Sequence, residues 1–228
     1  SAVGGIAVTP GPLPEMWRAA LLGLAVFMAS ASAGAFNQWA EADLDQHMKR
    51  TANRPFATGR LNANGAWLAA ILGLLAVSVA LAYAVSNGWA ALYTFMGAFV
   101  YGIVYTVWLK RRSWTNIVVG GAAGSFAVLA GAAAVDPSIP MAALILTAVI
   151  FLWTPPHFWS LAIAAHENYA SAKVPMLPVI AGDGLTAKVI LAHTALLVGL
   201  LFIPVVSRMG FIYLAGAASG GRLFVWTS

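Results

Sequence analysis

Seven long apolar segments, separated by short polar ones, constrain this chain more than any other feature. A helix that crosses a bilayer needs about 20 mostly apolar residues, and each segment has roughly that length. Turn signals such as Asn87-Gly88 and Asp183-Gly184 separate them. The sequence therefore predicts an all-α, polytopic bundle of transmembrane helices. The segments are residues 17–36, 66–85, 89–109, 117–135, 141–165, 187–206 and 210–226.

The composition supports a membrane protein and argues against a soluble one. Hydrophobic residues make up 61% of the chain and charged residues only 8%, whereas a soluble domain has about 25% charged residues. The 22 glycines suit the close approach of helices in membranes. The net charge is +5, but the basic residues lie in short loops between apolar segments. We therefore exclude nucleic acid as a partner and expect a lipid bilayer.

The basic residues are distributed unevenly between the two ends of the predicted bundle. Ten of the 12 lysines and arginines lie at one end, and only Arg18 and Arg208 lie at the other. Because cytoplasmic loops are enriched in Lys and Arg, we expect the basic end to face the cytoplasm. The acidic residues Glu41, Asp43, Asp45, Glu167 and Asp183 share that end. Basic and acidic residues gathered at the same end are expected of a binding or catalytic site.

A polar stretch follows the first apolar segment without a helix breaker, so we expect the helix to continue through Arg50. Asn37, Glu41 and Asp45 then lie four residues apart on one face of that helix. Their oxygens suit a hard divalent cation, and Mg²⁺ usually shares such ligands with substrate phosphates. The alternative is a set of solvated acids paired with nearby basic residues. We favour the metal, because polar groups at membrane depth are costly and usually functional.

Two basic loops flank these acids. One contains Arg50 and Arg54, and the other contains Lys110, Arg111 and Arg112. Arg matches phosphate oxygens with a two-pronged fork, and Lys contributes a point charge. Basic residues beside a membrane also set topology and bind anionic lipid head groups. The neighbouring acids make a diphosphate held by Mg²⁺ the stronger interpretation.

A second polar stretch lies at the end of the fifth apolar segment. Pro155-Pro156 is expected to break or kink that segment, and broken or kinked membrane helices often line cavities. His157 follows, between Trp153 and Trp159. It is expected to contact a ligand or else to bond a freed backbone carbonyl. The aromatic rings suit a carbocation or a flat macrocycle, although such rings also pack helices in general.

Six polar segments together resemble the protoheme IX farnesyltransferases, which belong to the intramembrane, UbiA-type prenyltransferases. The resemblance covers nearly the whole chain, and the segments occur in matching order and spacing. They are residues 37–45 (NQWAEADLD), 49–55 (KRTANRP), 105–112 (YTVWLKRR), 116–124 (NIVVGGAAG), 154–159 (TPPHFW) and 174–178 (VPMLP).

The resemblance implies a fold of nine membrane helices around a central cavity, about seven of which are present here. Residues 1–8 resemble the last turns of a further span. We therefore expect residues 1–228 to form a single transmembrane prenyltransferase domain that is truncated at both ends.

The resemblance also implies a reaction, a location and partners. The reaction is transfer of a farnesyl group from farnesyl diphosphate to a vinyl group of heme b, which gives heme O for terminal oxidases. The location is a bacterial cytoplasmic membrane, with the motif loops facing the cytoplasm. Heme A synthase or assembly factors of the terminal oxidase are the expected protein partners.

The resemblance further implies Mg²⁺ bound through two acidic motifs. The first maps onto Asn37, Glu41 and Asp45, which become the expected catalytic residues and metal ligands. The second motif of the family has Asp where this chain has Asn168, so one negative charge is lost, and Glu167 or Asn168 is the expected ligand. The residues expected to bind the substrates are Arg50, Arg54, Lys110, Arg111, Arg112, Trp153, His157, Trp159, Tyr169 and Lys173.

Three alternatives remain open, one of which is an inactive fragment with no function of its own. A related prenyltransferase would act on an aromatic acid or a quinone precursor, but such relatives usually carry Asp at the position of Glu41 and lack the run at 154–159. A membrane transporter of small molecules would also use kinked helices and polar groups near the midplane. It predicts paired half-chain repeats and no dependence on Mg²⁺, and we see no internal repeat in the sequence.

Overall fold

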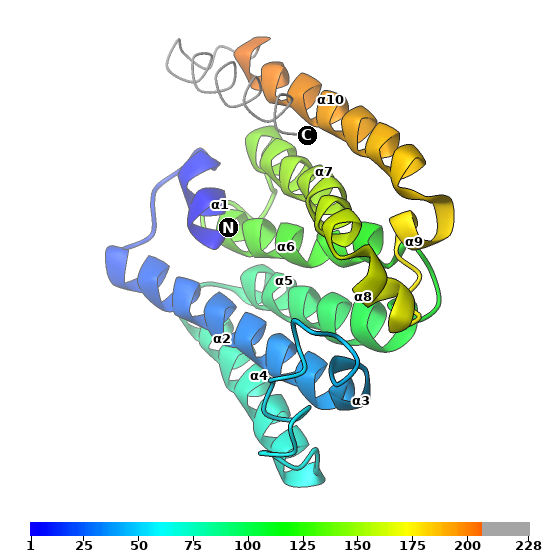
Figure 1. The fold of residues 1–228 in the computed structure, drawn as a ribbon. Helices are drawn as coiled ribbons and strands as arrows, with labels where there is room; N and C mark the ends of the chain where they lie inside the picture. The colour runs from blue at the N-terminus through cyan, green and yellow to red at the C-terminus, as the bar shows by residue number, and fades with distance from the viewer. Residues whose placement is uncertain (207–228) are drawn as a thin grey trace.

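The computed structural model describes residues 1–206, and the secondary structure of these residues is entirely helical, as predicted. Three short helices, α3, α8 and α9, gather on one side of the bundle (Figure 1). In chain order the helices are α1 (Ala2–Val8), α2 (Met16–Ala40), α3 (Ala42–Asp45), α4 (Gly65–Val85), α5 (Gly88–Phe99), the π-helix η1 (Val100–Leu109), α6 (Asn116–Ala133), α7 (Met141–Ala164), α8 (His166–Ser171), α9 (Leu177–Ala181) and α10 (Asp183–Val206).

Six helices in the described part of the chain are long and apolar enough to cross a membrane. They are α2, α4, the continuous helix formed by α5 and η1, α6, α7 and α10. They coincide with the first six predicted segments, and their bounds differ from the predicted ones by a few residues. The seventh predicted segment, residues 210–226, lies outside the described residues. This arrangement is that of a multi-pass membrane protein.

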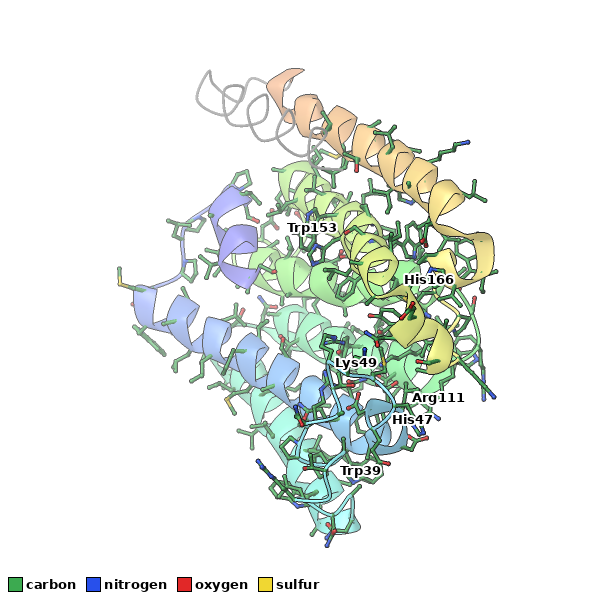
Figure 2. The ribbon with its side chains drawn as sticks, viewed as in Figure 1. Trp39, His47, Lys49, Arg111, Trp153 and His166 are labelled. Carbon is green, nitrogen blue, oxygen red and sulfur yellow. The ribbon has the colours of Figure 1, made fainter. Side chains whose placement is uncertain are left out.

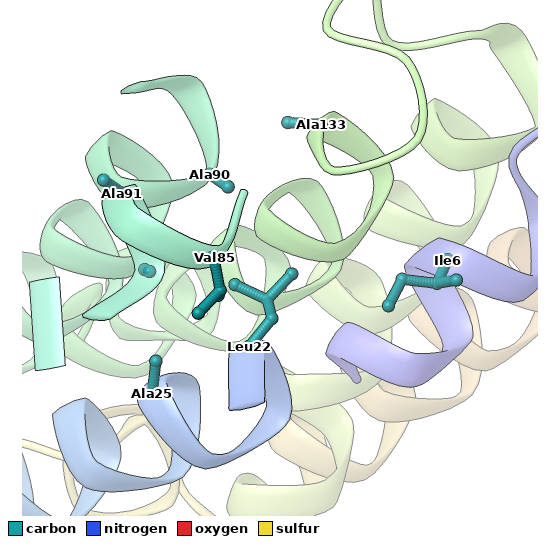
Figure 3. Packing of buried hydrophobic residues seen from close by; sticks show 8 residues of the cluster. Ile6, Leu22, Ala25, Val85, Ala90, Ala91 and Ala133 are labelled. Atoms are coloured by element: carbon teal, nitrogen blue, oxygen red, sulfur yellow. The ribbon is translucent and has the colours of Figure 1, made fainter. Parts of the chain in front are cut away.

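The long helices pack against one another largely in chain order. α2 contacts α4 and α5, α5 contacts α6, α6 contacts α7, and α7 contacts α10. One core cluster lies where α1, α2, α4, α5 and α6 meet (Figure 3). Five of its eight members are alanines, as expected where helix backbones approach closely in a membrane. Its members are Ile6, Leu22, Ala25, Ala82, Val85, Ala90, Ala91 and Ala133.

Two glycines allow α1 to lie directly on α6. A Cβ added at Gly5 would lie 2.1 Å from the carbonyl oxygen of Val128, and one added at Gly131 would lie 1.9 Å from the carbonyl oxygen of Ala2. No real side chain tolerates such distances, so both positions require glycine. The helical conformation predicted for residues 1–8 is confirmed by α1.

Of the predicted break or kink at Pro155-Pro156, the break is wrong. α7 is continuous through both prolines, which are buried inside it. Proline has no N–H, so the carbonyl of Phe151 loses its usual helix partner. Membrane helices tolerate this loss where neighbouring helices pack closely. Gly121 of α6 provides such packing, because a Cβ there would lie 3.0 Å from Thr154 and 3.4 Å from the Phe151 carbonyl oxygen.

Replacing Gly131 by Ala is expected to destabilise the bundle, because the added methyl group meets the carbonyl of Ala2. Overpacking of this kind costs about 1–3 kcal/mol, so the midpoint of thermal unfolding in detergent should fall. Gly73→Ala in α4 is the matched control, since nothing lies within 4 Å of a Cβ there. Equal midpoints for the two variants would contradict the direct packing of α1 on α6.

Candidate active site

The site begins where α2 ends. The predicted continuation of this helix through Arg50 is wrong, because Glu41 leaves the helical conformation with φ −117° and ψ 20°. Two helical hydrogen bonds nevertheless span the break. The N–H of Glu41 donates to the carbonyl of Asn37 at 3.0 Å, and the N–H of Asp45 donates to the carbonyl of Glu41 at 2.9 Å. The three side chains therefore keep the spacing of successive turns although the helix is interrupted.

Glu41 and Asp45 are buried, each with 1% of its surface exposed, and each is held by one cation. Lys110 Nζ, just after η1, forms an ion pair with Glu41 Oε2. Arg54 Nη1, in the loop after α3, donates to both carboxylate oxygens of Asp45 at 2.9 and 3.1 Å. A buried carboxylate without a partner is strongly unfavourable. Both partners come from other segments of the chain, beyond the interrupted helix.

Asn37 connects the two ion pairs. Its Nδ2 donates to Glu41 Oε2 at 2.5 Å and to Thr106 Oγ1 at 3.1 Å. Its Oδ1 accepts from Arg54 Nη1 at 3.4 Å. The predicted convergence of Asn37, Glu41 and Asp45 is therefore observed, and one Arg and one Lys join it.

The π-helix η1 sets the position of Lys110. The Lys110 N–H donates to the carbonyl of Tyr105, five residues back, at 2.8 Å. Lys110 Nζ also lies 5.7 Å from the centre of the Tyr105 ring, as in a cation–π contact. π-helical turns are rare and frequently occur at functional sites. No local pattern in the sequence predicted this one, because the residues are ordinary apolar helix residues.

A cavity of about 280 Å³ opens beside these groups. Charged and amide side chains form one part of its wall, and aromatic and apolar side chains form the rest. Of the predicted site residues, Asn37, Asp45, Arg50, Arg54, Lys110 and Tyr169 line it. The remaining lining residues were not among the predicted site residues. They are Met48, Thr51, Tyr101, Tyr105, Ile117, Gly120, Thr154, Phe158, Val174 and Met176.

Three predicted basic residues lie outside the cavity lining. Arg111 donates to both oxygens of Asp43 at 2.7 and 2.9 Å, and both side chains are well exposed. The hydrogen bond from Arg111 is the main reason why the pKa of Asp43 is lowered. Arg112 and Lys173 are exposed. Figure 2 shows Arg111 on the side of the bundle where His47 also lies.

The predicted aromatic residues occupy two different environments. Trp153 and His157 stack on α7 with ring centres 4.5 Å apart and 14° between their planes, and neither lines the cavity. Trp153 lies apart from the basic side of the bundle in Figure 2. Trp159 is buried in a core cluster, and its ring meets that of His193 on α10 edge-on at 5.4 Å. Phe158, next in the chain to His157, is the aromatic residue of this stretch that lines the cavity.

The predicted second metal motif does not join the first. Glu167 and Asn168 lie on α8, and neither lines the cavity, although the following Tyr169 does. Within residues 1–206, no group of three or more His, Asp and Glu side chains is arranged to hold a metal ion. Among the described residues, the candidate metal ligands beside the cavity are therefore the two acids and the amide of the first motif.

The first motif fits a divalent cation. Glu41 Oε1 is buried and has no hydrogen-bond partner among the described residues, and a hard cation would satisfy that oxygen. The charges of Glu41 and Asp45 are neutralised by Lys110 and Arg54. A metal ion bound to the acids would therefore release both basic groups for an anion.

Replacing Lys110 by Met is expected to destabilise the protein, because it leaves Glu41 charged and buried. Loss of one partner of a buried ion pair lowers the free energy of unfolding by about 3–5 kcal/mol. The double variant Lys110→Met with Glu41→Gln should regain most of that stability. Arg111→Met is the control, because its partner Asp43 is exposed and such pairs contribute at most about 1 kcal/mol. Equal losses for Lys110→Met and Arg111→Met in thermal unfolding would contradict this assignment.

The chain resembles known sequences over its whole length. The model of the UbiA prenyltransferase family matches residues 1–228. Protoheme IX farnesyltransferase 2 of Paramagnetospirillum magneticum is 50% identical over 228 residues, which cover 100% of this chain and 79% of the relative. Protoheme IX farnesyltransferase 1 of the same organism is 49% identical, with 90% of this chain and 72% of the relative covered. The protoheme IX farnesyltransferase of Acidiphilium cryptum is 43% identical, with 98% and 70% covered.

Solved structures share the fold. A UbiA homologue from Archaeoglobus fulgidus bound to DMAPP and Mg²⁺ has a TM-score of 0.79 at 20% identity, and the match covers 99% of this chain and 77% of that one. The same homologue bound to GPP and Mg²⁺ has a TM-score of 0.80 at 19% identity, with 99% and 80% covered. The prediction of a UbiA-type helical bundle is confirmed. With its fold, its acidic motif and its relatives in agreement, this chain belongs to the UbiA prenyltransferase family and, within it, to the protoheme IX farnesyltransferases.

Proposed function

We propose that this chain transfers a farnesyl group from farnesyl diphosphate to a vinyl group of heme b, giving heme O, with Mg²⁺ as its metal. The observation that carries the proposal is the arrangement of two buried acids and one amide with Arg54 and Lys110 beside a cavity. The relatives named protoheme IX farnesyltransferase, at up to 50% identity, support the choice of substrates.

The residues that would hold Mg²⁺ are Asn37 through Oδ1, Glu41 and Asp45. Bound there, Mg²⁺ supplies neutralising charge to the diphosphate oxygens. Arg54 and Lys110 line the cavity and are paired with the acids. With the acids engaged by the metal, both basic side chains would be free to bind the diphosphate oxygens. Such preplaced charge favours the departing diphosphate over the intact ester, which lowers the barrier to bond cleavage.

The reaction breaks the bond between C1 of the farnesyl chain and the diphosphate oxygen, and the electron pair of that bond leaves with the diphosphate. The resulting allylic cation is attacked by a vinyl carbon of heme b. The other vinyl carbon is left electron-deficient and takes up water with loss of a proton. Tyr101, Tyr105 and Phe158 in the cavity wall suit the allylic cation, because the faces of aromatic rings attract positive charge.

We assign the porphyrin to the stacked pair Trp153 and His157. These two rings stack face to face on α7, and the exposed ring of Trp153 could receive a flat macrocycle. The His157 ring also meets Phe158 edge-on at 5.4 Å. Since Phe158 lines the cavity, we place the vinyl edge of the porphyrin toward the farnesyl chain. Trp159 receives no such role, because it is packed in the core against α10.

The other predicted ligands take different roles. Arg50 and Tyr169 line the cavity, and we assign them to the substrates. The exposed Arg111, Arg112 and Lys173 suit anionic lipid head groups and the control of topology. A contribution of Glu167 or Asn168 to the metal site requires α8 to move toward the first motif, because neither lines the cavity.

We place the chain in a bacterial cytoplasmic membrane, with the end that carries α3, α8 and the loop after η1 facing the cytoplasm. The support is the gathering of basic residues in the loops at this end, which follows the positive-inside rule. Farnesyl diphosphate, which is charged and water-soluble at its head, would reach the cavity from this side. Heme A synthase and assembly factors of the terminal oxidase remain the expected protein partners.

Incubation of the purified protein with heme b, farnesyl diphosphate and Mg²⁺ is expected to give heme O, detected by its mass, and a chelator should abolish the product. Asp45→Asn should lower turnover by about 10²–10³-fold, the usual cost of one preplaced electrostatic group. Asp43→Asn is the matched control. It removes an acid of the same short helix whose Arg partner lies outside the cavity, so turnover should stay within about twofold.

Three outcomes would contradict the proposal. Turnover that survives the chelator would exclude the metal. Equal losses for Asp43→Asn and Asp45→Asn would exclude the assigned site. Prenylation of a hydroxybenzoate in place of heme b would move the chain to a different substrate class.

A further inference from the structure

The orientation of the Asn37 amide decides whether this residue can bind a cation. An amide presents either its oxygen or its NH₂ group to a ligand, and only the oxygen is a ligand for Mg²⁺. Asn37 is buried at the end of α2. The hydrogen-bond partners of the amide must therefore fix whether its oxygen or its NH₂ group faces the cavity.

Thr106 in η1 is the residue that faces the other end of this amide. It is buried, and its hydroxyl donates its single hydrogen to the carbonyl of Tyr101 at 2.8 Å. This bond reaches five residues back, as the π-helical geometry of η1 allows. Because the hydrogen is used, the hydroxyl can only accept from Asn37. The group of Asn37 that lies 3.1 Å from Thr106 Oγ1 must therefore be the NH₂ group.

The second N–H of the same NH₂ group is also occupied. It donates to Glu41 Oε2, the oxygen that also pairs with Lys110. Both donors of the amide are thus occupied, one by Thr106 and one by Glu41, and Oδ1 accepts from Arg54 Nη1. Asn37 and Arg54 both line the cavity. The amide oxygen therefore lies on the side where the metal and the diphosphate would bind.

We propose that Thr106 is a positioning residue, which orients Asn37 so that Oδ1 faces the cation held with Glu41 and Asp45. This inference rests on the proposed function, because the cation is the one that accompanies the diphosphate. It also assigns a role to η1. The π-helical turn places the Tyr101 carbonyl where it accepts the hydroxyl hydrogen of Thr106, so that Thr106 Oγ1 can only accept a hydrogen bond from Asn37.

Binding of Mn²⁺, used as a probe for Mg²⁺, tests the proposal without turnover. The purified protein is titrated with Mn²⁺ in the presence of farnesyl thiodiphosphate, a poorly cleaved analogue, and free Mn²⁺ is followed by electron paramagnetic resonance. Thr106→Val, which removes the acceptor but nearly keeps the shape, is expected to raise the apparent Kd about 10-fold, as loss of a residue that supports a metal ligand does. Thr106→Ser keeps the hydroxyl and should bind like the unsubstituted protein.

Thr94→Val is the matched control. Thr94 is a buried threonine of the same continuous helix, and its hydroxyl donates to the carbonyl of Ala90 at 2.8 Å. It lies far along the helix from the acidic motif, so this variant should leave the Kd for Mn²⁺ unchanged. A tenfold increase in this variant would show that loss of any buried hydroxyl from the helix weakens the site, and would overturn the inference.

Asn37→Asp separates orientation from a general structural role. A carboxylate has oxygens at both ends and no NH₂ group to orient, so adding Thr106→Val to Asn37→Asp should not raise the Kd further. A similar loss in both backgrounds would overturn the inference, as would an unchanged Kd for Thr106→Val alone. Absence of Mn²⁺ binding by the unsubstituted protein in the presence of farnesyl thiodiphosphate would instead overturn the proposed function.

Discussion

Two carboxylates can remain charged inside the end of a membrane bundle only if cations neutralise them, and this requirement organises the site. Glu41 takes Lys110 from the end of η1, and Asp45 takes Arg54 from the loop after α3. Each partner comes from a different segment, so the ion pairs tie the end of α2 to both of them. Asn37 bonds to members of both pairs. These side chains therefore form one connected polar network beside the cavity.

The sequence was informative wherever local patterns decide structure. Long apolar segments predicted the six described spans, because their length is set by the thickness of the bilayer. The spacing of Asn37, Glu41 and Asp45 predicted their convergence, and two helical hydrogen bonds preserve that spacing through the break in α2. Family resemblance, carried by the polar segments, was confirmed over the whole chain.

The sequence was uninformative where contacts between segments decide structure. Lys110 and Arg111 are adjacent, yet one lines the cavity and the other pairs with Asp43 outside it. The helix breaks at Glu41, where the side chain pairs with Lys110 from another segment. The continuity of α7 through Pro155 depends on close packing that Gly121 makes possible. None of these features can be recognised from a pattern of neighbouring residues in the sequence.

A crystal structure with Mn²⁺ and farnesyl thiodiphosphate, with the metal located by its anomalous scattering, would show where the cation and the diphosphate bind. We predict a Mn²⁺ peak bound by Asn37 Oδ1, Glu41 and Asp45, with Arg54 and Lys110 moved from the acids to the diphosphate oxygens. A metal peak elsewhere in the cavity, or a bound diphosphate with both cations still paired to Glu41 and Asp45, would contradict it.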